Sequence, residues 1–143
     1  MKLLFKALTK NGPDEFVWVK GLPVFDYNGN CKVTGLDTGK LFYNIVEETI
    51  CQSIGKIDKN GREIFIKDRL KFVRKLGKQE IVEELTVYYS EETSQVVVGK
   101  AGALLPLNMF NVSEAEVVGN ENDDNFIKDG GKIKQVKKGR KNA

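Results

Sequence analysis

The sequence predicts a mainly β protein, in which a small SH3-like or partly open barrel follows an N-terminal β-meander. Short apolar runs are separated by turn signals about every ten residues, which is typical of β-barrels and sandwiches. Fourteen glycines among the 143 residues supply many of these turns. A sustained apolar stripe of helical periodicity is missing, since the nearest approach, Gln79 to Leu85, is too short to predict a helix.

The first predicted region, residues 1–52, is the β-meander. Lys2–Leu8 and Phe16–Val19 lie on either side of an Asn-Gly-Pro turn, which indicates a hairpin. A second turn, Asp26–Asn30, separates short apolar pieces on its two sides. After it we expect a returning strand, a loop and a further strand, at residues 31–34, 35–40 and 41–50.

The second predicted region, residues 53–127, is barrel-like and shares one core with the meander. Its strongest turn signal is Asp58-Lys59-Asn60-Gly61, ahead of the apolar run Ile64–Ile66. We expect a bulge at Lys67-Asp68, where a polar pair interrupts the alternation that continues to Leu70 and Phe72. Later strands are predicted at Glu84–Tyr89, Gln95–Val98 and Glu114–Val118, while Pro106 opposes a long helix at residues 104–110.

The last predicted region, residues 128–143, is a flexible, disordered basic tail. It carries seven basic residues and one acid, a charge of +6, whereas the rest of the chain has 16 basic and 19 acidic residues, a charge of −3. Lysines in such a segment can bind phosphate backbones without sequence preference. The alternative is a solvated end, because the tail has no aromatic residue to stack on bases. The candidate nucleic-acid contacts are Lys132, Lys134, Lys137, Lys138, Arg140 and Lys141.

Catalytic and metal-binding motifs are not recognisable, so we expect no enzyme, no metal and no cofactor. The chain has no histidine, the commonest general base and zinc ligand. Cys31 and Cys51 could pair in space, but inert or partly buried thiols are expected in a small cytoplasmic chain, and the two cysteines form no metal-binding spacing. Asp58–Gly61 and Asn120–Asn125 resemble only fragments of a calcium loop and are read as a turn and a solvated loop. Neighbouring acidic pairs, such as Glu47-Glu48, would point to opposite faces of a strand.

The sequence also predicts a cytoplasmic protein without membrane contact. Its longest apolar stretches, Val96–Val98 and Ala101–Leu107, are far shorter than the roughly 20 residues of a membrane span. The first eight residues include Lys6 and have no small-residue cleavage site, so a secretory signal is not expected.

The segment Ile45–Phe72 resembles the YopX-like family of small phage and prophage proteins. The similar residues are Val46–Gln52, Gly55, Asp58–Phe65, Asp68, Leu70 and Phe72. Trp18–Phe25 and Glu116–Asn120 resemble two further family segments. Ile54, Lys56 and Lys67 stand where the family has Thr, Leu and Gly. The resemblance implies a β-rich, barrel-like fold and a bacterial host, and transfers no catalytic residue.

We therefore expect a phage or prophage accessory protein that binds another macromolecule without chemistry. Its partner would be an unknown protein or a second copy of the chain. One alternative is nucleic-acid binding through the basic tail. A second alternative, which the sequence disfavours, is a metal-dependent carboxylate hydrolase.

Overall fold

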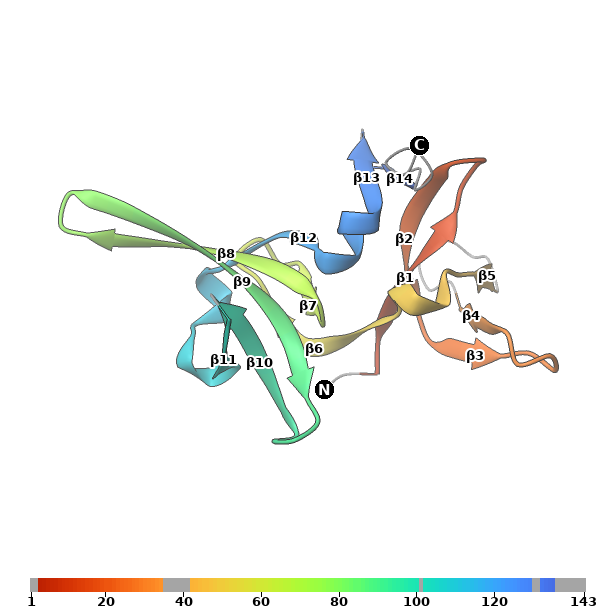
Figure 1. The fold of residues 1–143 in the computed structure, drawn as a ribbon, viewed down its shortest axis with the longest axis horizontal. Coiled ribbons are helices and arrows are strands. Elements are labelled where there is room, and N and C mark those ends of the chain that lie inside the picture. Colours follow the sequence, from red (N-terminus) through yellow and green to blue (C-terminus); the bar gives the residue numbers. More distant parts are fainter. Residues whose placement is uncertain (1–2, 35–41, 101, 130–131, 136–143) are drawn as a thin grey trace. The chain divides into compact units, whose positions relative to one another are not determined.

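The protein is built from β-strands and short 3-10 turns, and the described part of the chain contains no α-helix (Figure 1). The computed structural model describes residues 3–34, 42–100, 102–129 and 132–135. The chain divides into two units. The curled unit is centred on Gln52–Glu121, and the hairpin unit joins Leu4–Cys51 to the C-terminal part that begins at Asn122. The domain boundaries and the shared core predicted from the sequence stay predictions.

The hairpin unit begins with the predicted first hairpin. β1 (Phe5–Lys10) pairs antiparallel with β2 (Glu15–Gly21), in a register that sets Phe5 against Gly21. The Asn-Gly-Pro turn closes this pair, as its residue types indicate. Leu8, Phe16 and Phe126 form one buried cluster, in which the rings of Phe16 and Phe126 meet edge to face at 4.8 Å.

A second sheet of the hairpin unit is built around the turn at Asp26–Asn30. β3 (Pro23–Phe25) and β4 (Cys31–Val33) pair antiparallel, and β5 (Tyr43–Asn44) pairs with β4. The strand expected at residues 41–50 is therefore wrong beyond Asn44, because Glu47–Thr49 form a 3-10 turn. The Thr49 hydroxyl donates to the Val46 carbonyl at 2.6 Å and stabilises that turn. The loop expected at residues 35–40 lies outside the described residues.

The C-terminal part adds two strands to the hairpin unit. β13 (Phe126–Asp129) pairs with β14 (Lys132–Gln135), and β14 pairs with β2. The structure thus has strand backbone in part of the segment that the sequence assigns to a flexible tail. Residues 136–143 lie outside the described part.

The curled unit contains a five-stranded antiparallel sheet that curls into a half-barrel, which confirms the predicted mainly β class (Figure 1). Its strand order is β11-β10-β9-β8-β12. Their bounds are Asp68–Leu76 for β8, Gln79–Ser90 for β9, Gln95–Lys100 for β10, Ala103–Pro106 for β11 and Glu116–Asn120 for β12. The hairpin predicted from Glu84–Tyr89 and Gln95–Val98 is confirmed as the pair β9–β10.

Two further strands, β6 (Cys51–Ile57) and β7 (Glu63–Phe65), flank the predicted turn at Asp58–Gly61. Two 3-10 turns, η2 (Leu107–Met109) and η3 (Val112–Glu114), connect β11 to β12. A third, η4 (Glu121–Asn125), follows β12 and replaces the loop expected there. The core of the curled unit consists of aliphatic and aromatic side chains from strands and turns alike. It comprises Ile54, Ile64, Leu70, Phe72, Leu85, Val87, Val98, Leu107, Val112 and Ala115.

Candidate binding groove

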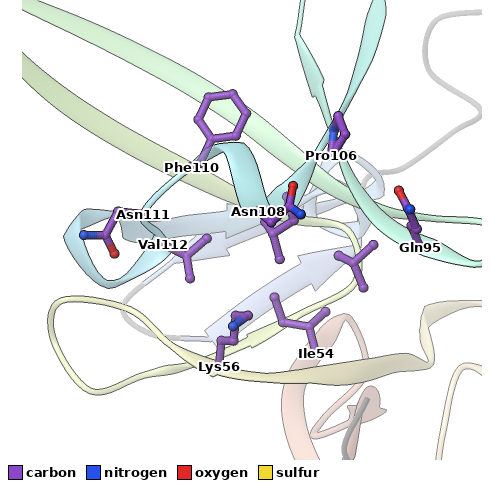
Figure 2. A pocket seen from close by; sticks show the side chains of 10 residues that line it. Ile54, Lys56, Gln95, Pro106, Asn108, Phe110, Asn111 and Val112 are labelled. Atoms are coloured by element: carbon purple, nitrogen blue, oxygen red, sulfur yellow. The ribbon is translucent and has the colours of Figure 1, made fainter.

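An open groove of about 510 Å³ lies on the curled unit, between β6 and the segment that runs from β11 through η2 and η3 (Figure 2). Figure 2 shows Ile54 and Lys56 of β6 on one side, with Asn108 and Val112 opposite them. The start of β10 contributes the remaining wall. The lining residues are Ile54, Lys56, Gln95, Val96, Pro106, Leu107, Asn108, Phe110, Asn111 and Val112.

The turn segment folds over the groove because its apolar residues are anchored in the core. Leu107 and Val112 are buried, and Phe110 packs against Phe72 with 5.7 Å between the ring centroids. Pro106 ends β11 and cannot donate to a continuing strand ladder. The Phe110 and Ala115 amides donate to the carbonyls three residues before them, which closes both 3-10 turns. The wall of the groove is therefore part of the folded core.

The groove has an apolar floor and a polar rim. Ile54, Leu107 and Val112 form the floor, whereas the side chains of the rim are exposed to solvent. The Ser113 hydroxyl donates to the Asn111 side-chain oxygen at 2.6 Å, which orients that amide. Lys56, Gln95 and Asn108 make no side-chain hydrogen bond with any other described residue. Such a rim can supply amide donors and acceptors to a bound chain while the floor takes its apolar groups.

Asp58, a residue of the family-like segment, lies in the turn outside this groove. Its Oδ1 accepts the amides of Asn60 and Arg62 at 2.8 and 2.9 Å, and its Oδ2 accepts the amide of Val117 at 2.9 Å. Burial alone raises the pKa of Asp58, but the amides of Val117, Arg62 and Asn60 outweigh it and hold the pKa below its ordinary value. Its carboxylate therefore ties the β6–β7 turn to β12.

Asp68 has an equally structural role at the start of β8. This fully buried carboxylate accepts the Phe65 amide at 2.8 Å and the Asn120 side-chain amide at 2.8 Å. Lys67, the residue directly before Asp68, has a positive φ of 74°, and its amide donates to the Val87 carbonyl at 2.6 Å. The chain thus makes a left-handed bend at this lysine.

The remaining predicted sites belong to the hairpin unit or lie outside the described residues. Lys132 and Lys134 lie on β14 of the hairpin unit, and Lys137, Lys138, Arg140 and Lys141 lie outside the described residues. Cys31 and Cys51 are both buried and form no disulfide, and burial, with Glu47 nearby, raises the pKa of Cys31. A raised pKa disfavours the reactive thiolate.

The described residues contain neither a cluster of metal ligands nor a helix that could cross a membrane. Among them, three or more histidine, cysteine, aspartate or glutamate side chains nowhere gather as a metal site would need. None of their helices is long and apolar enough to cross a membrane.

Sequence reasoning missed the groove, because its walls come from segments around residues 54, 95 and 110. Local patterns give no signal that these segments meet.

The family resemblance of the sequence, in contrast, is shown by comparison with known families. No curated protein and no solved structure matches the chain. A family model described as YopX protein matches residues 18–124, which is most of the sequence. The chain therefore belongs to the YopX family.

Proposed function

We propose that this protein is a non-catalytic binding module that holds an extended segment of another protein in the groove of its curled unit. The observation that carries the proposal is the pairing of an apolar floor with side-chain amides that have no partner among the described residues. Amides of this kind can donate to and accept from a peptide backbone. The apolar floor would take alternate side chains of the same peptide.

The sheet beside the groove supports a peptide as the ligand. β11 is one of the two edge strands of the five-stranded sheet, and its last residue, Pro106, lines the groove. An edge strand presents backbone groups that can pair with an added chain. The resemblance to phage and prophage proteins supports an accessory role in a phage or prophage, in which the partner is another protein of the phage or its host.

The test is a selection from a random peptide library displayed on phage, followed by calorimetric titration of the selected peptides. We expect Asn108→Tyr, which fills the exposed rim of the groove, to weaken these peptides at least about tenfold, about 1.4 kcal/mol. Met109→Tyr is the matched control, because Met109 is the next residue, is 65% exposed and does not line the groove. Equal affinity for both variants would place the binding surface elsewhere.

A second candidate function is nucleic-acid binding through the basic C-terminal end. The charge asymmetry supports it, since seven of the 23 basic residues lie within residues 128–143. Such binding would be dominated by phosphate contacts and would weaken steeply with salt.

A further inference from the structure

A two-stranded ribbon, here called the arm (Val73–Val82), extends from the five-stranded sheet. β12 pairs with β8 only as far as Lys71, and β10 pairs with β9 only as far as Thr86. Beyond these points β8 and β9 pair with each other alone, up to the turn between Leu76 and Gln79. Figure 1 shows this ribbon projecting beyond the other strands of its unit.

Both faces of the arm carry exposed aliphatic side chains. Val73 and Val82 are direct cross-strand neighbours and are 46% and 56% exposed. On the opposite face, Leu76 and Ile81 are diagonal neighbours and are 61% and 37% exposed. A two-stranded ribbon with no core beneath it is marginally stable in water. Apolar residues gathered on such a ribbon are typical of a surface that another chain covers.

The face that carries Val73 and Val82, here called the outer face, also has an ordered charge pattern. Lys75 lies directly across from Glu80, and Lys71 lies directly across from Glu84. All four point to the outer face, because directly opposed residues share a face and alternate positions repeat it. The β8 side of this face is therefore basic and the β9 side acidic, with the two valines between the charged pairs.

We propose that the arm is a homodimerisation surface, on which the outer faces of two copies pack against each other. A two-fold rotation about an axis parallel to the strands lays β8 of one copy over β9 of the other. Val73 then faces Val82 of the second copy, and Lys75 faces Glu80 of the second copy. The same patch is used twice, as a two-fold interface requires. Rotation about an axis across the strands would instead oppose lysine to lysine, so the charge pattern selects one arrangement.

The charge of the curled unit and the size of the paired face bear on the strength of this contact. Met1–Leu3 and Gln52–Glu121 together carry eleven basic and eleven acidic residues, so net repulsion does not oppose association of the curled unit. The paired face spans about six residues of each strand, roughly 20 Å in length. Two strands of this length offer less area than a standard protein interface, so the contact is a weak one that forms only at high protein concentration.

The test is sedimentation velocity of the full chain over a concentration series that extends well above the micromolar range, at low salt. The wild type is expected to shift from one to two chains as concentration rises. Lys75→Glu and Glu80→Lys should each remain monomeric alone, because like charges then face each other across the two-fold axis. An equimolar mixture of the two variants should recover the dimer, since one copy is acidic on both strands and the other basic.

The matched control is the double variant Lys75→Glu/Glu80→Lys, which exchanges the two charges and should dimerise like the wild type. It keeps an oppositely charged cross-strand pair inside each arm. It therefore shows whether the single variants lose the dimer because the two copies repel each other or because β8 and β9 no longer pair within one arm. Val73→Thr/Val82→Thr preserves shape and β-propensity and should abolish the dimer. A wild type that stays monomeric at the highest concentration overturns the proposal. A dimer that survives both single variants, or a mixture that recovers nothing, also overturns it.

Discussion

Lys67 holds a backbone conformation that costs an L-residue about 1–2 kcal/mol, yet its amide and carbonyl both take part in the fold. Lys67→Gly removes that cost but adds freedom to the unfolded chain, so we expect a net gain of up to about 1 kcal/mol in unfolding free energy. Chemical denaturation at neutral pH measures it. Lys67→Ala is the control and should give no gain, because alanine keeps the steric penalty.

Asp58 should make the stability of the protein depend on acid pH. Its pKa is lowered in the folded state, so its contribution is complete above the ordinary carboxyl pKa of 3.8 and is lost as pH falls through the lower folded value. Denaturation from pH 7 down to strongly acidic pH should therefore show a smaller loss of stability for Asp58→Asn than for the wild type. Asp14→Asn, at an exposed carboxylate, is the control. Parallel profiles for Asp58→Asn and the wild type would argue against this role.

At the scale of elements, Gly21 fixes the end of β2 against the returning chain. A Cβ at this position would lie 1.5 Å from the Thr34 carbonyl oxygen, a backbone atom that cannot move alone. Thr34 and Leu22 also exchange hydrogen bonds at 3.0 Å. We expect Gly21→Ala to destabilise the protein by about 3 kcal/mol or more, as overpacking against backbone does. Gly29→Ala should cost less, only about 1–2 kcal/mol for its positive φ of 81°, because no atom lies within 4 Å of its Cβ; equal losses in thermal melts would contradict the steric account.

The elements that the sequence predicts well are those whose signals are local. The turns at Asp26–Asn30 and Asp58–Gly61 contain Asn-Gly pairs, and both separate paired strands. The 3-10 turn at Glu47–Thr49 escapes prediction because its flanking residues suit a strand equally well. The arm was missed although Gly77-Lys78 is a two-residue hairpin signal, with Gly77 at a φ of 63°. The groove required contacts among distant segments, which no local pattern contains.

At the scale of the whole molecule, the features that suggest binding lie in different units. The groove and the arm belong to the curled unit, whereas the basic C-terminal segment belongs to the hairpin unit. The curled unit is charge-neutral, so the net charge of +3 of the chain resides in the hairpin unit. A protein partner for one unit and a polyanion for the other are thus independent hypotheses, and each can fail without the other.

The polyanion hypothesis predicts salt-dependent binding that follows the C-terminal charges. The sharpest truncation ends at Gln135, because it keeps β13 and β14, which pair with each other and with β2. It removes Lys137, Lys138, Arg140 and Lys141. Fluorescence anisotropy with single- and double-stranded oligonucleotides should then show weaker binding, with the slope of log affinity against log salt reduced by about three. Lys132→Gln/Lys134→Gln in the full chain measures how much the two lysines of β14 contribute to nucleic-acid binding. If the truncated and full chains bind alike, residues 136–143 do not carry the binding. If neither chain binds at low salt, the polyanion hypothesis fails and the groove remains the surface to test.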